Sequence, residues 1–212
     1  MEVVALDVEP AMRAHAQLKA AAADVTLSYV CGDMAAFDAA AVTGGDDEGG
    51  RVQLACVLFG SAVHLLTNDA VLSCLSCVRR VLAPGGVLVL ELEHPTDVFF
   101  GEHSGSAWEV EDVGTGGTLV VEWGRDGDEF DAVTQVLQRR ITFTVCDAEG
   151  EVTLCREVAM PQRRFTATEV DALARAGGFR VEALYGGLEL PHVPLDHVDA
   201  FRMVAVLAAD AQ

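Results

Sequence analysis

Basic residues are scarce in this sequence. Its 212 residues contain 14 Lys plus Arg against 33 Asp plus Glu, which gives a formal charge of −19 at pH 7. Proteins that bind nucleic acid need clustered cations to neutralise phosphates, and anionic membrane surfaces attract the same clusters. We therefore expect neither a nucleic acid nor a membrane as partner. The Arg-Arg pairs lie in apolar contexts and are interpreted as charges at helix C-termini or strand edges: Arg79–Arg80, Arg139–Arg140 and Arg163–Arg164.

Long hydrophobic runs are lacking too. The most apolar stretch, Val52–Leu66, is shorter than a bilayer span and is interrupted by Gln53, Ser61 and His64, so it predicts a buried strand followed by a loop. The N-terminus has neither a basic leader nor a cleavable apolar segment, so we expect no secretory signal and a cytoplasmic location. In that compartment the six cysteines are expected to be reduced.

Metal-like cysteine spacing is limited to one C-x-x-C, formed by Cys74 and Cys77. These residues lie within an apolar helical stripe that runs from Val71 to Leu82, and no second C-x-x-C or C-x-x-H follows them. Cysteine is commonly a small buried hydrophobe, so we favour that role over a metal or redox site. Cys146 and Cys155 could face each other across a hairpin, where the same role is expected.

Strand-like and helix-like segments alternate through residues 1–95. With 51% hydrophobic residues, the chain can bury one domain or two small ones. Apolar strands interleaved with amphipathic helices predict a parallel sheet covered on both faces. The expected strands are Val3–Leu6, Val25–Val30, Gln53–Phe59 and Val87–Glu93, and the expected helices are Pro10–Ala23, Met34–Ala41 and Asp69–Leu82.

Two expected helices have clear end signals. Thr67 or Asn68 can cap the helix Asp69–Leu82, and the Pro84-Gly85-Gly86 turn stops it. The acidic, glycine-rich loop Thr43–Gly50 is expected to be a surface insertion. Near the C-terminus, Thr166 or Thr168 caps a helix that Gly177-Gly178 ends.

The pattern changes to period two after residue 95. Residues 96–165 alternate apolar and polar positions between hydrophilic turns, which predicts an antiparallel meander of about four strands. Residues 166–212 then supply a helix and two last strands, FRVEALYG and FRMVAVLAA. We expect these two strands to complete the α/β core begun by residues 1–95.

Four short stretches stand in order along the chain: LDVEPAM, CGDM, VLAPGGVLVLELEHP and ARAGGF. In this order the sequence resembles the class I S-adenosylmethionine-dependent methyltransferases. The resemblance implies a Rossmann-like α/β sheet and S-adenosylmethionine as cofactor. Asp7 would bind the ribose hydroxyls, since a carboxylate can accept two hydrogen bonds from one diol, and Asp33 would accept the adenine amino group. Met34 would lie against the adenine ring, with Met12 or Val8 on its other side.

Each of these signals has a local alternative. Asp7 could be an acid at a helix N-terminus ahead of Pro10, and Asp33 could be a helix cap. The APGG run could be nothing more than a helix stop. Their order and spacing within the strand-helix alternation favour the family resemblance.

The meander carries a narrower resemblance, to small-molecule methyltransferases such as sugar N-methyltransferases. In those proteins an antiparallel β insertion roofs the substrate pocket and often forms a dimer contact. Trp108 and Trp123 are therefore candidates for pocket or dimer contacts, although packed strand aromatics are the favoured interpretation. The resemblance implies a small-molecule acceptor and a homodimer formed through the insertion.

The acceptor should lie past the carboxyl ends of the later parallel strands. That expectation places Phe59 and Gly60 against the cofactor and His94 as the base, with a His bound to the backbone as the alternative. No metal ligands are expected. The predicted acceptor contacts are Ser61, His64, Glu93 and Tyr185, with His192 a weaker candidate.

One expected element is missing. The family's first strand, with its glycine-rich loop, should lie between the strands Val3–Leu6 and Gln53–Phe59, and no such segment precedes Asp7. Loss of a central strand would leave two unpaired ladders, so we expect a sheet that is incomplete on its N-terminal side. Three interpretations follow: a fragment or mis-started form of a working methyltransferase, a catalytically inactive scaffold or dimerisation protein, or a module that binds another nucleoside.

Overall fold

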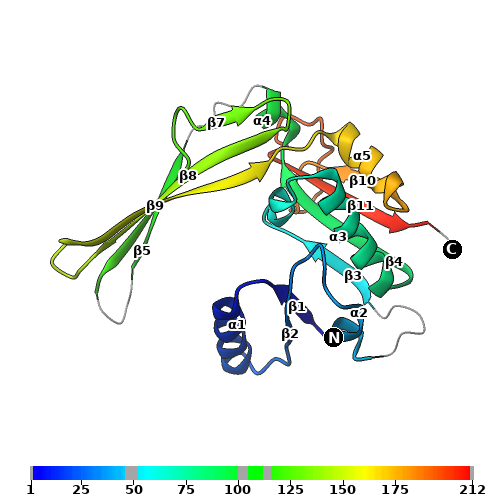
Figure 1. The fold of residues 1–212 in the computed structure, drawn as a ribbon, viewed down its shortest axis with the longest axis horizontal. Coiled ribbons are helices and arrows are strands. Elements are labelled where there is room, and N and C mark those ends of the chain that lie inside the picture. Colours follow the sequence, from blue (N-terminus) through cyan, green and yellow to red (C-terminus); the bar gives the residue numbers. More distant parts are fainter. Residues whose placement is uncertain (1, 46–51, 100–104, 112–115, 211–212) are drawn as a thin grey trace.

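The chain folds into three β-sheets (Figure 1). The computed structural model describes residues 2–45, 52–99, 105–111 and 116–210. We call residues 2–45 the N-terminal unit, the four-stranded sheet with its helices the core, and the five-stranded sheet the arm. None of the described helices is long and apolar enough to span a membrane.

The N-terminal unit is a β-α-β-α segment. Its strands β1 and β2 pair in parallel as a sheet of two strands, in a register that sets Asp7 opposite Cys31. Pro10 begins α1, where its missing N–H costs nothing. The elements are β1 (Val4–Asp7), α1 (Pro10–Ala22), β2 (Ser28–Cys31) and α2 (Ala39–Thr43).

Two expected elements of this unit differ in the structure. The strand predicted from Val25 begins at Ser28. The helix predicted from Met34 is wrong in its first half, because Asp33 starts a turn there: its carboxylate accepts from the Ala35 N–H at 2.8 Å. Helix α2 begins only after Asp38, whose side chain caps it. Residues 46–50 of the expected Thr43–Gly50 loop lie outside the described residues.

The core sheet has the order β10-β11-β4-β3, in which β3 and β4 are parallel and the other pairs are antiparallel. Strand β4 begins at Leu82, earlier than expected, because Leu82 pairs with Val52 ahead of the Pro84-Gly85-Gly86 turn. The elements are β3 (Val52–Val57), the 3-10 turn η1 (Ser61–His64), α3 (Asn68–Val81), β4 (Leu82–Glu93), α5 (Ala167–Ala176), β10 (Phe179–Tyr185) and β11 (Arg202–Ala209).

The predicted helix ends are confirmed in the core. Thr67 caps α3 through its hydroxyl, which accepts from the Ala70 N–H at 3.1 Å. Thr166 caps α5 in a capping box with Glu169, and the helix ends at Gly177.

Buried side chains concentrate between the core sheet and helices α3 and α5. Leu88, Phe179 and Met203 are fully buried there. Cys74 and Cys77 are each 3% exposed in the same cluster, which confirms their role as small hydrophobes. Burial, with smaller contributions from Cys77 and Asp33, raises the pKa of Cys74 to about 12.

The arm is an antiparallel sheet that projects from the core (Figure 1). The prediction of about four strands missed one short strand, β7. Cys146 pairs with Val152, and Cys155 pairs with Thr144, so the two cysteines are not opposite each other and that expectation is wrong. The elements are α4 (Pro95–Phe99), β5 (Ser106–Glu111), β6 (Thr118–Trp123), β7 (Glu129–Asp131), β8 (Val136–Cys146) and β9 (Val152–Arg163).

The N-terminal unit and the core sheet do not join. Within the described residues β1 pairs with β2 and β3 pairs with β4, and no ladder links β1 to β3. Apolar side chains are consequently exposed beside the gap, including Leu54 on β3, which is 56% exposed. Among the described residues, β1 and β3 therefore each have one edge without a partner strand.

Candidate functional site

Asp7 and Asp33 lie at the carboxyl ends of the neighbouring strands β1 and β2. Asp7 ends β1, its carbonyl accepts from the Gly32 N–H at 3.0 Å, and Asp33 is the next residue along. One oxygen of each carboxylate accepts a local backbone N–H, from Glu9 at 2.9 Å and from Ala35 at 2.8 Å. These bonds orient the two carboxylates, and the second oxygen of each remains for a ligand.

The helix-cap alternative does not hold for Asp33, and Asp7 lies just ahead of α1 without being its N-cap. The N-cap of α1 is Glu9, whose carboxylate accepts from the Ala11 N–H at 3.0 Å. The N-cap of α2 is Asp38. Asp7 and Asp33 therefore sit in turns at strand ends, where two acceptors suit a ligand with hydroxyl and amino donors.

Apolar side chains accompany the two carboxylates. Val8 is 67% exposed directly after Asp7, and Met12 is 49% exposed on the first turns of α1. Met34 follows Asp33 and is partly buried against the hydrophobic cluster of the core. Carboxylates beside exposed apolar groups fit a flat, apolar ring that carries polar substituents, such as a nucleoside.

The end of β3 forms a second border of the site. Phe59 and Gly60 both have left-handed backbones, with φ of 53° and 70°, and the Phe59 ring is 86% exposed. The carboxylate of Glu91 accepts from the Phe59 N–H at 2.8 Å. Ser61 is bound to the turn itself, since its hydroxyl donates to the Leu58 carbonyl at 2.9 Å, while His64 is exposed on η1.

Glu93 lies among buried arginines where the arm meets the core. It forms an ion pair with Arg164, and its other oxygen is 3.9 Å from Arg139. Both arginine side chains are less than 10% exposed, and burial lowers the pKa of Arg164 to about 10. The prediction that these Arg-Arg pairs are strand-edge charges is wrong for Arg139, Arg163 and Arg164, which are all buried. The pattern did contain a signal, because Arg139 occupies the inward position between Leu137 and Ile141.

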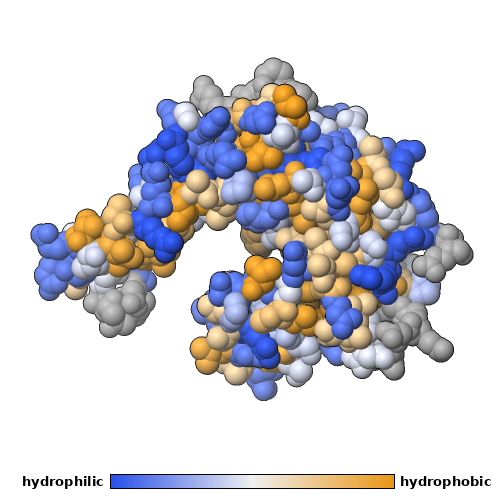
Figure 2. All heavy atoms as spheres, in the orientation of Figure 1, coloured by the Kyte–Doolittle hydropathy of each residue, from blue (hydrophilic) through white to orange (hydrophobic). Residues whose placement is uncertain are grey.

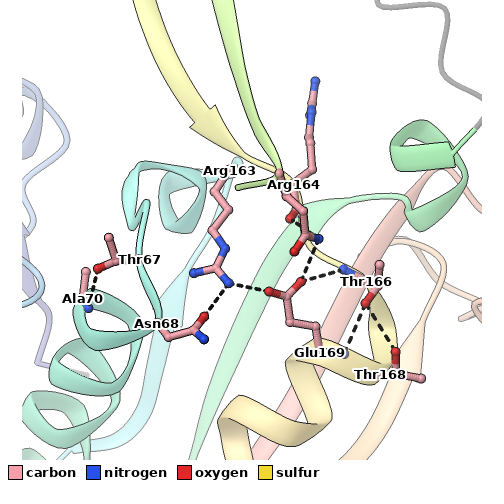
Figure 3. Close-up of polar contacts among 9 residues, drawn as sticks. Thr67, Asn68, Ala70, Arg163, Arg164, Thr166, Thr168 and Glu169 are labelled. Atoms are coloured by element: carbon pink, nitrogen blue, oxygen red, sulfur yellow. Dashed lines mark hydrogen bonds and ion pairs between the residues drawn. The ribbon is translucent and has the colours of Figure 1, made fainter. Parts of the chain in front are cut away.

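Arg163 points away from Arg164 and ties the arm to two core helices (Figure 3). Its guanidinium donates to Asn68 at 2.5 Å, on the first turn of α3, and to Glu169 on the first turn of α5. It also lies over the Phe165 ring, 4.8 Å from the centroid. The arm therefore leaves the core at a fixed point.

His94 is bound to backbone on both sides of its ring. Its Nδ1 accepts from the Thr96 N–H at 3.2 Å, so Nε2 carries the proton and donates to the Leu195 carbonyl at 2.9 Å. This geometry matches the backbone-bound alternative, and a role as base would require one of these bonds to open. His94 borders an open pocket of about 430 Å³, which is also lined by Pro95, Ala167, Leu184, Pro194, Leu195 and Asp196.

The remaining candidates lie apart from the carboxylates. Tyr185 stacks on His192 with ring centroids 4.6 Å apart, on β10, the edge strand farthest from β3. Trp108 and Trp123 contact each other across neighbouring arm strands, with ring centroids 6.1 Å apart, and Trp108 is 45% exposed. The structure thus brings Asp7, Asp33 and their apolar neighbours together, and it separates them from Tyr185.

Figure 2 shows a concave space between the arm and the N-terminal unit. Strands β1 and β3 both point toward this side of the molecule in Figure 1. A Rossmann-like fold places ligands beyond the carboxyl ends of its strands. The α/β order and the carboxylates at the strand ends are the arrangement expected of a Rossmann-like fold that binds a nucleotide.

Comparisons with known proteins specify the class. Residues 1–86 match the family model of the methyltransferase domain. A methyltransferase of Clostridium acetobutylicum, described as S-adenosylmethionine-dependent, is similar in structure with a TM-score of 0.74 at 13% identity, over 100% of this chain and 76% of that chain. The CcbJ methyltransferase of Streptomyces caelestis is similar with a TM-score of 0.70 at 20% identity, over 99% of this chain and 80% of that chain. No curated protein matches the chain.

A further similar structure is CalS10 of Micromonospora echinaspora, an amino pentose methyltransferase solved with S-adenosylmethionine bound. It is 26% identical, with a TM-score of 0.60, over 97% of this chain and 73% of that chain. Residues 1–86 thus match a methyltransferase domain, and the chain has the Rossmann-like α/β fold of these solved methyltransferase structures.

Proposed function

We propose that this protein transfers a methyl group from S-adenosylmethionine to a small-molecule acceptor. The observation that carries the proposal is the pair of oriented carboxylates, Asp7 and Asp33, at adjacent strand ends. Asp7 would accept from the ribose hydroxyls and Asp33 from the adenine amino group, with Val8, Met12 and Met34 beside the ring. S-adenosylmethionine supplies an electrophilic methyl, so the chain's own task is to align the acceptor and exclude water.

The acceptor would lie in the concave space beneath the arm. Residues 96–165 would roof it, with residues 1–95 and 166–212 forming the cofactor-binding core. Ser61, His64 and Glu93 would border the acceptor, and the pocket beside His94 extends toward the strand that carries Tyr185. CalS10 is described as acting on an amino pentose, so amino sugars are the first acceptor class to test.

The arm also supports a homodimer as part of this proposal. The cross-strand register places a row of apolar residues on one face of the arm sheet. Glu109 and Glu122 lie on the opposite face. A second copy would cover that face, and sedimentation velocity would show the dimer. The apolar row contains Trp108, Val110, Leu119, Val121, Trp123, Phe143, Val145 and Leu154, and the exposed Arg156 lies on the same face opposite Phe143.

Calorimetric titration with S-adenosylhomocysteine tests the cofactor site. We expect micromolar binding that Asp7→Ala abolishes. Asp126→Ala is the matched control, because Asp126 is an exposed carboxylate on an arm turn. A folded chain that gives no heat would contradict the proposal.

The alternative function is a catalytically inactive scaffold. Among the described residues, no strand pairs with the free edges of β1 and β3. On this alternative the chain dimerises through the arm and does not bind S-adenosylhomocysteine. The same titration, combined with sedimentation, separates the two functions.

A further inference from the structure

Phe59 combines two unfavourable features at the end of β3. Its backbone is left-handed, with φ of 53°, which is rare for a bulky residue. Its ring is 86% exposed, so packing of the side chain does not offset the strain. Strain of this kind persists only where the surroundings enforce it, and it clusters at ligand-binding sites.

The enforcing group is the carboxylate of Glu91. Strand β3 ends at Val57, which pairs with Leu90, so the next residues of β3 have no ladder beside Glu91. The Glu91 side chain takes the place of that ladder and accepts from the Phe59 N–H at 2.8 Å. Glu91 is 5% exposed, and its other oxygen lies 3.6 Å from Arg202 on β11. A charged acceptor in a dry setting makes a strong hydrogen bond.

We propose that Glu91 is a positioning residue for the cofactor. Its carboxylate fixes the Phe59–Gly60 turn, so that the Phe59 ring stands at the border of the site as an apolar wall for the adenosyl group. This inference rests on the proposed function. It assigns to Glu91 a role that its charge alone does not suggest.

Two other roles fit Glu91 less well. A catalytic base needs a carboxylate that reaches the acceptor, whereas Glu91 is buried and both of its oxygens face protein groups. A plain ion pair with Arg202 would need no bond to Phe59. The bond spans 32 residues of sequence and joins the ends of two neighbouring strands.

The test compares four variants: Glu91→Gln, Glu91→Ala, Phe59→Gly and the double variant Glu91→Ala/Phe59→Gly. Affinity for S-adenosylhomocysteine is measured by calorimetry, and exchange of the Phe59 amide by NMR. Glu91→Ala should weaken binding by about tenfold or more and speed exchange of the Phe59 amide, since a bond to a charged group is lost. Glu91→Gln should weaken binding less than Glu91→Ala, because its amide oxygen still accepts from Phe59 although the charge that faces Arg202 is lost.

The double variant identifies the route by which Glu91 acts. Glycine adopts a positive φ without support, and Phe59→Gly also removes the ring. Glu91→Ala should therefore add little to the loss that Phe59→Gly already causes. Glu182→Ala on β10 is the control for an exposed carboxylate paired with arginine, and it should change neither readout.

Three outcomes would overturn the inference. Additive losses in the double variant would show that Glu91 acts independently of the turn. A Phe59 amide that exchanges at the wild-type rate after Glu91→Ala would show that the carboxylate does not hold it. Unchanged binding after Glu91→Ala would overturn this inference alone, whereas a folded wild-type chain that does not bind S-adenosylhomocysteine would overturn the proposed function as well.

Discussion

The N-terminal unit and the core are built from the same kind of segment, yet they differ in burial. In the core, helix α3 buries Val71, Cys74, Leu75, Cys77, Val78 and Val81 against the sheet. In the N-terminal unit, helix α1 buries Ala20, while Met12 and Leu18 are 49% and 72% exposed. The local sequence pattern thus produced a helix in both regions, but a packed interior formed only beside α3 in the core.

Strand β1 pairs with β2 alone among the described residues, whereas the core sheet has four strands. Parallel strands are stable when both faces and both edges are covered, and two strands with one helix cover too little surface. The unit is attached to the core through the segment after β2: the Ala35 carbonyl accepts from the Ser73 hydroxyl at 2.6 Å, Phe37 packs into the core cluster, and Ala39 and Val42 of α2 pack against it. A βα segment therefore buries its apolar side chains only when its strand pairs within a larger sheet.

Hydrogen exchange tests the difference in stability between the core and the N-terminal unit most directly. Exchange of β4 amides such as Leu88 should require global unfolding, with a free energy of about 5–15 kcal/mol. Exchange of β1 amides such as Leu6 should require only local opening, with a much lower free energy. We expect exchange rates to differ by about a thousandfold or more. Similar protection in the two strands, read by NMR, would show that the N-terminal unit is held as firmly as the core.

Truncation of leucines should give the next largest effect. Leu88→Ala removes a side chain that is 0% exposed and should cost about 2–5 kcal/mol of unfolding free energy. Leu18→Ala on α1 is the matched change at a 72% exposed site and should cost less than about 0.5 kcal/mol. Urea unfolding of both variants measures this, and equal losses would contradict the contrast in burial.

The third prediction concerns Asp128 in the arm, whose contribution to the free energy of unfolding should depend on pH. Burial raises the pKa of Asp128, but hydrogen bonds from Arg140 and the Arg125 N–H outweigh it and hold the pKa below its ordinary value of 3.8. Its contribution is therefore complete above the unfolded pKa and disappears as the pH falls through the folded pKa. Asp128→Asn should cost about 1–3 kcal/mol at pH 7.

Urea unfolding at pH 7, pH 4 and pH 2.5 tests the sign of this effect. The gap between wild type and Asp128→Asn should shrink toward zero at the lowest pH. Asp126→Asn, two residues away on the same turn and exposed, should leave stability unchanged at all three. A gap that is independent of pH would mean that the carboxylate does not act through its charge.

Helix caps should give the smallest difference. Thr166→Ala removes a capping box at the start of α5 and should cost about 1 kcal/mol. Asp38→Ala removes the cap of α2, a helix of five residues in the N-terminal unit. Because that unit opens separately, the change should cost global stability only about a few tenths of a kcal/mol. Thermal unfolding of the two variants measures these losses of stability. A larger loss of stability for Asp38→Ala than for Thr166→Ala would contradict the prediction.

Local features could be predicted from the sequence because their causes are local. The N-cap of α3 at Thr67, the capping residue Thr166 and the strand-end positions of Asp7 and Asp33 all follow from a few neighbouring residues. Helix α2 was placed too early because the Asp33 turn competes with helix over Met34–Ala36.

Distant contacts could not be predicted in the same way. The bond from Glu91 to Phe59 spans 32 residues, and that from His94 to Leu195 spans 101. Arg163 and Arg164 are adjacent in sequence, but they join different partners because successive residues of a strand point to opposite faces. Nothing in the local pattern distinguishes them.

Periodicity and capping act over a few residues, so the alternation of strands and helices, the acidic strand ends and the antiparallel meander are predictable from sequence. Which strand edges find partners depends on the tertiary structure. Strand β3 joined β4, whereas β1 paired with β2 alone, because backbone pairing requires a neighbour within reach and the position between them holds no described strand.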